Sequence, residues 1–204
     1  FVQTKVETAT HGVGGPTVKA GRDEAVLDDD LNPMEPGTGV IGKLARGGNI
    51  PVGYYKDPEK TATTFVTAAD GVRYAVAGDF ATLEADGTIT LLGRGSVSIN
   101  SGGEKIFPEE VEGVLKAHPG VYDTLVVGVP DDRWGQAVCA VGQPRHADAP
   151  PELADLADHC RNHLAGYKVP RHLVLSDQIV RPPSGKPDHR WASGLADEQM
   201  DHTP

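Results

Sequence analysis

The strongest constraint on the fold is a hairpin pattern in residues 80–93, which read FATLEADGTITLLG. Two runs that alternate apolar and polar residues flank Asp86-Gly87, a pair that tolerates the positive φ angles of a tight turn. Because this alternation puts the apolar side chains on one face, we expect two antiparallel strands here. The short stretch 93–96, Gly-Arg-Gly-Ser, follows the hairpin, and it is the best candidate for a domain boundary.

The residues before the hairpin are rich in turn formers. Three segments predict short strands separated by turns: VGGPTVKAG (13–21), NPMEPGTGVIGKLARGG (32–48) and KDPEKTA (56–62). We therefore expect a small, β-rich, barrel-like unit. The chain begins with Phe1 rather than Met, and residues 1–6 have the pattern of a strand interior, so we expect it to be a piece of a longer protein.

The pattern changes after residue 96. Pro108 suits the first turn of a helix, and Val111, Val114 and Leu115 give it an apolar stripe. We expect strands at 121–130, 136–144 and 172–180, a second amphipathic helix marked by apolar residues at 153, 156, 157, 160 and 164, and a last helix from about Asp188. This mixture predicts a compact α+β domain with a short central sheet and flanking helices.

Composition and charge narrow the possible functions. The net charge of -10 argues against a nucleic-acid partner. The segment from Arg161 to Arg190, however, contains six basic residues and only two acidic ones. This local positive charge is consistent with binding of an anionic small molecule, and also with an ordinary mixed-charge surface. The sequence has no apolar run of about 18 residues and only two cysteines, Cys139 and Cys160, both in apolar patterns, and we expect no signal peptide. We therefore expect a globular, cytoplasmic protein with both thiols in its core.

Two loops of small residues each carry a lysine: SGGEK (101–105) and PSGKP (183–187). Neither is a phosphate-binding P-loop, because the first lacks the G-x-x-x-x-G-K-[ST] spacing and the second has Pro187 where a metal-binding hydroxyl is needed. Each loop therefore needs another explanation.

Six motifs in one order provide that explanation: GVIGKLARGGNIPVGYYKDPEKT (39–61), GDF (78–80), LLGR (91–94), SINSGGEKIFPEEVE (98–112), LAGYKVPRHL (164–173) and PPSGKPDHR (182–190). Together they resemble the late motifs of the acyl-adenylate-forming, AMP-binding enzymes, especially the fatty-acyl-CoA synthetases. The resemblance implies that residues 1–95 are the last part of a large N-terminal domain. Residues 96–204 would then form the mobile C-terminal domain of the same enzyme. The triphosphate loop, the Mg ligands and most of the acyl pocket would lie upstream.

The resemblance also implies a reaction in two halves. A carboxylic acid, such as a fatty acid, attacks ATP to give an acyl-adenylate, and coenzyme A then displaces AMP. ATP, coenzyme A and Mg are the implied substrates and cofactor, and the chain by itself should be inactive. Two alternatives stay open: an enzyme that passes the adenylate to a carrier protein or an oxidation, and a detached, non-catalytic binding module.

In the resembling motifs, Asp79 matches the carboxylate that holds the ribose of the nucleotide, and Arg94 matches an arginine that reaches its ribose or phosphate. Ala77 replaces the hydroxyl-bearing residue usual in the family, so a contact from that position is not expected. Ser96 matches the hinge. The plain alternatives for Asp79 and Arg94 are an aspartate in a turn before a strand and a surface arginine of the hairpin.

Gly102 and Gly103 match the loop that lines the pantetheine tunnel, where missing Cβ atoms leave room for a slender chain. We give Glu104 and Lys105 no catalytic role. Lys186 matches the catalytic lysine, which orients the carboxylate and the α-phosphate and offsets charge in the transition state. Arg190 completes that motif as a supporting residue.

Histidines His159 and His163 stand four apart on a predicted helix, a spacing that zinc can use. Because no third ligand is evident, we expect an ordinary helix surface. Trp134 in PDDRWGQ (130–136) is expected to pack. The sequence gives neither the acyl chain length nor the oligomeric state.

Overall fold

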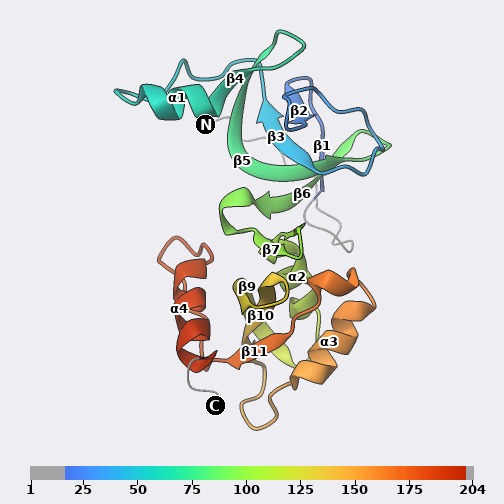
Figure 1. The fold of residues 1–204 in the computed structure, drawn as a ribbon, viewed down its shortest axis with the longest axis vertical. Coiled ribbons are helices and arrows are strands. Elements are labelled where there is room, and N and C mark those ends of the chain that lie inside the picture. The colour runs from blue at the N-terminus through green and yellow to red at the C-terminus, as the bar shows by residue number, and fades with distance from the viewer. Residues whose placement is uncertain (1–16, 201–204) are drawn as a thin grey trace. The chain divides into compact units, whose positions relative to one another are not determined.

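The computed structural model describes residues 17–200, so the predicted strand at 1–6 lies outside the described residues. The chain forms two compact units, residues 1–96 and 97–204. Figure 1 labels their helices and strands, and each unit is described by itself. Both contain helices and sheets, which confirms the expected α+β class.

The first unit is a six-stranded antiparallel sheet in the order β1-β6-β5-β3-β2, with β4 beside β5. Its strands are β1 Thr17–Lys19, β2 Glu24–Leu27, β3 Gly42–Arg46, β4 Phe65–Thr67, β5 Arg73–Leu83 and β6 Thr88–Arg94. The sheet curls because register shifts interrupt its pairing on both sides of β5, and such bulges bend a strand.

The predicted hairpin is confirmed. β5 and β6 pair around Asp86-Gly87, and Gly87 takes a φ of 80°. The turn closes through hydrogen bonds from the Gly87 amide to the Glu84 carbonyl and from the Glu84 amide to the Thr88 carbonyl. Ile89 is fully buried, so the apolar face of the hairpin packs into the core of the unit.

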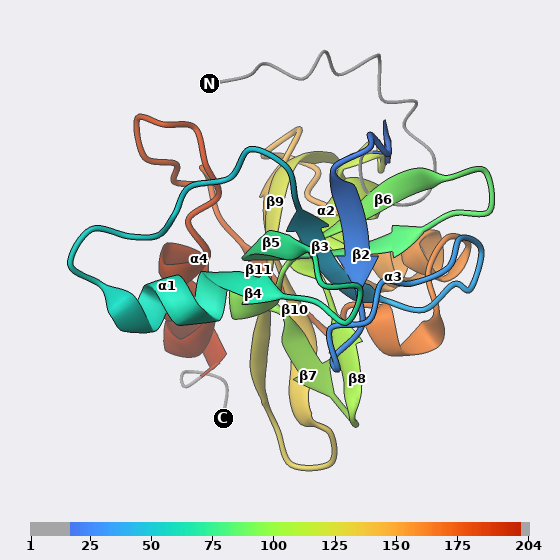
Figure 2. The same cartoon turned by 90° about the horizontal axis from the view of Figure 1, so that it is seen from above.

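The prediction for KDPEKTA was wrong, because helix α1 occupies Pro58–Thr64 and leads into β4 (Figure 2). The Asp57 side chain accepts a hydrogen bond from the Lys60 amide at 2.9 Å, and Pro58 fills the first turn, where no amide is needed. The sequence Asp57-Pro58-Glu59 is itself a helix start signal, and it outweighs the turn formers that favoured a short strand here.

The second unit holds a five-stranded sheet in which β9 and β11 flank β10 and β7 continues to β8. Its strands are β7 Ile99–Ser101, β8 Glu104–Ile106, β9 Val121–Asp131, β10 Gly135–Pro144 and β11 His172–Leu175, and its helices are α2 Pro108–Lys116, α3 Leu153–Arg161 and α4 His189–Met200. The chain also contains two short 3-10 turns, η1 (Gly95–Val97), where the first unit ends, and η2 (Gly166–Lys168), in the second unit.

Helices cover both faces of β9 and β10 in the second unit. Val126, Val138 and Ala140 face α2 and α3 in one core, while Leu125, Cys139 and others face α4 in a second core. Figure 1 shows α4 on one side of the strands and α3 on the other. Burial on both faces explains why these strands read as continuous apolar runs.

The three predicted helices are present, although the second ends at Arg161 and leaves His163 and Leu164 outside it, and one strand prediction holds only in part. Val111, Val114 and Leu115 are all buried on α2, and α4 starts beside Asp188, whose carboxylate accepts from the Trp191 amide at 3.1 Å. The expected strand 172–180 ends at Leu175. There the Ser176 hydroxyl donates to the carbonyl of Gln178, two residues further along, at 2.9 Å, a local bond that competes with strand pairing.

No helix among residues 17–200 combines the length and apolar character needed to span a membrane.

Two substitutions on α2 test the core of the second unit. Leu115→Ala removes a fully buried side chain and should lower the free energy of unfolding by about 2–5 kcal/mol. Gly113 lies on the same helix with open space around its Cβ position, so Gly113→Ala should instead stabilise by about 0.5–1 kcal/mol. Urea unfolding followed by tryptophan fluorescence measures the free energy of unfolding of the second unit, because the chain's two tryptophans, Trp134 and Trp191, both belong to it. Equal effects of the two variants would contradict the packing described.

Candidate functional site

Asp79 and Arg94 form a cross-strand pair at the end of the hairpin in the first unit. The Arg94 Nε donates to Asp79 Oδ1 at 3.1 Å, and the Asp79 side chain is 34% exposed while that of Arg94 is 65% exposed. Antiparallel pairing of β5 with β6 puts the two residues opposite each other. The structure thus brings together the two residues predicted to bind the nucleotide.

The predicted hinge residue, Ser96, is exposed in the η1 turn, where the first unit ends. Its neighbour Gly95 has a structural requirement of its own, since a Cβ there would lie 2.5 Å from the ring of Phe80. The hinge function of Ser96 stays a prediction.

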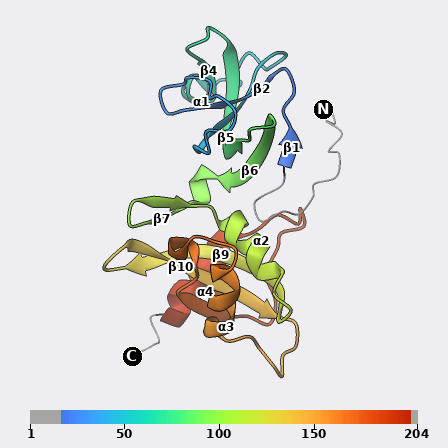
Figure 3. The same cartoon turned by 90° about the vertical axis from the view of Figure 1, so that its right-hand side faces the viewer.

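The predicted pantetheine loop is the turn between β7 and β8. Gly102 and Gly103 have φ angles of 61° and 90°, which only glycine adopts without strain. The Gly102 amide donates to the Trp134 carbonyl at 2.8 Å, and a Cβ on Gly102 would lie 2.6 Å from the Trp134 ring. Trp134, in the turn between β9 and β10, therefore packs against the glycine turn. Figure 3 shows the tips of the β7–β8 and β9–β10 hairpins on the same side of the unit.

Arginine side chains flank that tryptophan. The guanidinium carbons of Arg133 and Arg171 lie 4.6 and 5.4 Å from the centre of the Trp134 ring, within the range of cation–π attraction. Glu104 and Lys105 are exposed on β8. The turn is thus backed by an aromatic ring and bordered by positive charge.

Lys186 lies in an exposed loop just after a turn. The Gly185 amide donates to the Pro182 carbonyl at 2.8 Å, and Gly185 has a φ of 72°. Lys186 is exposed, and Arg190 is exposed on the first turn of α4. This arrangement presents the lysine at the surface of the unit.

The two lysine-bearing loops attach to opposite ends of β9. The glycine turn contacts Trp134, just beyond the end of the strand, whereas Arg181, near Lys186, binds Asp123 at its start. The strand from Asp123 to Asp131 covers roughly 25 Å. The structure therefore does not bring Lys186 and the glycine turn together.

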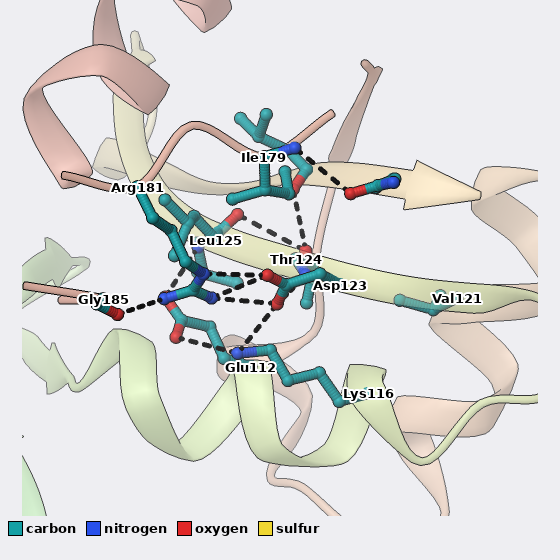
Figure 4. Close-up of polar contacts among 12 residues, drawn as sticks. Glu112, Lys116, Val121, Asp123, Thr124, Leu125, Ile179, Arg181 and Gly185 are labelled. Atoms are coloured by element: carbon teal, nitrogen blue, oxygen red, sulfur yellow. Dashed lines mark hydrogen bonds and ion pairs between the residues drawn. The ribbon is translucent and has the colours of Figure 1, made fainter. Parts of the chain in front are cut away.

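A network of charged groups holds the segment around Lys186 (Figure 4). Arg181 donates to both oxygens of Asp123 at 2.7–3.0 Å, and Lys116 approaches Asp123 at 3.2 Å. Burial raises the pKa of Asp123, but the hydrogen bonds from Arg181 and the charge of Lys116 outweigh it, so the pKa is lowered from 3.8. Arg181 Nη1 also approaches the Gly185 carbonyl at 3.4 Å.

A second contact holds the start of α4. His189 Nε2 lies 3.0 Å from Glu112 Oε1, and the two side chains are 14% and 5% exposed. The same oxygen accepts from the Val126 amide at 3.0 Å. Glu112 thereby satisfies a buried amide on β9 and joins α2 to α4.

Local sequence patterns predict neither these partners nor the ion pair of Lys168 with Glu110, at 2.7 Å and with both side chains 15% exposed. Each pair joins residues 58 or 77 positions apart. No local pattern signals such a contact, although PEEVE and GYKVP did lie in recognised motifs.

The predicted packing residues are buried or partly buried as expected, and burial raises the pKa of Cys139 to about 12 and that of Cys160 to about 11. The rings of His159 and His163 lie 5.2 Å apart, and His159 Nε2 contacts the Val114 carbonyl at 3.0 Å. Among residues 17–200, no three side chains of His, Cys, Asp or Glu are grouped so that they could hold a metal.

Comparison with known proteins identifies the class that this fold and these loops define. Residues 110–186 match the model of the AMP-binding enzyme C-terminal domain. This segment of the chain thus belongs to the AMP-binding enzyme C-terminal domain family.

The curated relatives that match most of this chain are CoA ligases. The chain is 60% identical over 186 residues to the medium/long-chain-fatty-acid–CoA/3-oxocholest-4-en-26-oate–CoA ligase of Mycolicibacterium smegmatis, covering 91% of this chain and 33% of that enzyme. It is 59% identical to the 3-oxocholest-4-en-26-oate–CoA ligase of Rhodococcus rhodochrous, covering 88% and 32%. It thus spans about a third of the length of these curated relatives.

Among solved structures, the amide bond synthetase McbA from Marinactinospora thermotolerans is similar, with a TM-score of 0.73 and 29% identity, over 89% of this chain and 35% of that one.

The glycine turn offers a matched pair of substitutions. Gly102→Ala would strain the backbone and also push a methyl group into Trp134, whereas Gly103→Ala would only strain the backbone, because nothing lies within 4 Å of its Cβ position. Both should destabilise by about 1–2 kcal/mol through the positive φ, and Gly102→Ala should cost more and shift the Trp134 emission. Equal unfolding energies and unchanged emission spectra would contradict the contact.

The lowered pKa of Asp123 predicts an acid-dependent loss of stability. The Asp123 contribution should be complete above 3.8, the unfolded-state pKa, and should disappear as the pH falls through the lower folded-state pKa. Urea midpoints of the wild type and Asp123→Asn, compared from pH 7 to pH 2, should therefore converge at the acid end. A difference that stays constant over this range would show that the carboxylate charge is not responsible.

Proposed function

We propose that this chain is part of an ATP-dependent acyl-CoA synthetase, an acid–thiol ligase that acts on a fatty acid or another hydrophobic carboxylic acid. The observation that carries the proposal is the placement of an exposed lysine turn and a glycine turn at opposite ends of one strand. Such a unit can present one loop in each half-reaction. The ligase names of the relatives support the substrate class.

In the first half-reaction, a substrate carboxylate oxygen attacks the α-phosphorus of ATP, the bond to the β-phosphate breaks, and pyrophosphate leaves. Lys186, as an ammonium near both anions, holds them together and offsets the charge that develops. Asp79 accepts hydrogen bonds from the ribose hydroxyls, since a carboxylate has room for several donors besides Arg94. Arg94 adds a positive charge beside the nucleotide.

In the second half-reaction, the sulfur of coenzyme A attacks the acyl carbon, and AMP leaves with the electron pair of the broken acyl–oxygen bond. The backbone of Gly102 and Gly103 borders the passage of the pantetheine arm, because neither residue has a Cβ to obstruct it. Residues 96–204 form the mobile domain that exchanges the two loops, residues 1–95 belong to the larger domain, and Ser96 lies at the hinge.

The remaining assignments are also proposals. Mg is the expected cofactor, with its ligands outside the residues described here. The protein is placed in the cytoplasm with small-molecule partners and no nucleic acid, on the basis of its charge and composition.

An adenylate-forming enzyme with another acceptor is the second candidate. The structural similarity to an amide bond synthetase supports this second candidate, because the fold alone does not determine which acceptor receives the acyl group. Supplying the complete enzyme with ATP and a fatty acid, and then with coenzyme A, a carrier-protein thiol or an amine, separates the candidates. Acyl-CoA formation supports the synthetase, and transfer only to another acceptor overturns it. A wild-type enzyme without adenylation would favour a binding module.

Lys186→Ala in the complete enzyme should reduce pyrophosphate release by at least about 100-fold, because it removes a charge that stabilises the transition state. The same variant should still convert a supplied acyl-adenylate to acyl-CoA. Lys19→Ala, at an exposed position on β1, serves as the control and should leave both steps unchanged. Near wild-type pyrophosphate release from Lys186→Ala would contradict the assigned role.

A further inference from the structure

The segment that carries Lys186 has few contacts of its own. Residues 182–187 are all exposed, and the Gly185 amide donates a hydrogen bond to the Pro182 carbonyl within the turn. A lysine on a four-carbon stem in such a loop needs support, because a displacement of about 1 Å can cost about 100-fold in rate. Support must therefore come from the residues on either side.

Arg181 provides support before the turn. Its guanidinium binds Asp123 through both carboxylate oxygens, a planar geometry that lysine cannot reproduce. The side chains of Arg181 and Asp123 are only 28% and 21% exposed, so water screens the pair less than a surface pair. Asp123 is itself fixed by the Thr124 amide at 2.8 Å and by Lys116.

His189 provides support after the turn. It contacts the buried Glu112, which the amide of Val126 holds in place. The chain is thus attached on one side of Lys186 to the start of β9 and on the other side to α2. Figure 4 shows Arg181 extending from the loop across to Asp123, with Gly185 on its other side.

We propose that Arg181 and Asp123 form a clamp that positions Lys186 for adenylation, with Glu112 and His189 as its second point of attachment. Arg181 and Asp123 are positioning residues, since they act on the substrate only through the lysine loop. The inference rests on the proposed synthetase function and names residues that set the efficiency of its first half-reaction. The glycine turn, at the other end of β9, does not depend on this clamp.

The test measures both half-reactions in the complete enzyme. Arg181→Gln and Asp123→Asn should each lower kcat for pyrophosphate release by about 10- to 100-fold. Thioester formation from a supplied acyl-adenylate should change less than about 3-fold, the margin expected for a step that does not use Lys186. Because both substitutions break the same pair, the double variant should be no slower than the slower single variant.

The control is Arg161→Gln. This substitution has the same chemistry, and Arg161 also pairs with an aspartate, Asp158, but on the exposed surface of α3, with 60% and 76% of the two side chains accessible. It should leave both half-reactions unchanged. Equal losses of both half-reactions in Arg181→Gln would indicate general destabilisation and overturn the proposal, as would pyrophosphate release within about 3-fold of wild type.

A second readout does not depend on catalysis. In the 204-residue chain labelled with ¹⁵N, Arg181→Gln should lower the backbone order parameters of Ser184, Gly185 and Lys186, the residues of the segment that carry an amide proton, but not those of the β7–β8 turn. If the wild-type enzyme formed no acyl-adenylate, the proposed function would fail while this measurement still tested the clamp. Unchanged order parameters in a folded variant would refute the clamp even in an active synthetase.

Discussion

The antiparallel pairing of β9 with β10 is the constraint on which the second unit depends. These two strands are paired from Val121 to Asp131, and their side chains alternate between two cores. Helices α2 and α3 cover one face and α4 covers the other. A long strand buried on both faces is stiff, so whatever attaches to its two ends keeps a fixed separation.

Both candidate loops attach to that strand. The Gly102 turn binds the backbone of Trp134 beyond one end, and Arg181 binds Asp123 at the other. The two contacts differ in kind. The first depends on a missing Cβ and a flat aromatic ring, whereas the second depends on paired charges and a guanidinium geometry. The first contact suits a loop that borders a neutral pantetheine arm. The second suits a loop that binds two anions, as proposed for Lys186.

Local patterns predicted much of the fold. Asp86-Gly87 predicted the hairpin, and Pro108 with the apolar stripe that follows it predicted α2. In both cases neighbouring residues determine the backbone conformation. Family motifs, not periodicity, singled out Lys186 and Asp79. The Asp123–Arg181 and Glu112–His189 contacts could not be predicted, since they join residues 58 and 77 positions apart and arise only when β9, α2 and α4 pack together.

We propose that the two ends of β9 serve two half-reactions, and crystal structures of the complete enzyme in two states would test this proposal. With ATP and an unreactive analogue of the acid, we expect Lys186 at the α-phosphate and the Gly102 turn away from the nucleotide. With an adenylate analogue and coenzyme A, we expect the pantetheine arm along Gly102 and Gly103, and Lys186 withdrawn. Lys186 at the phosphate in both states, or coenzyme A bound far from the glycine turn, would contradict it.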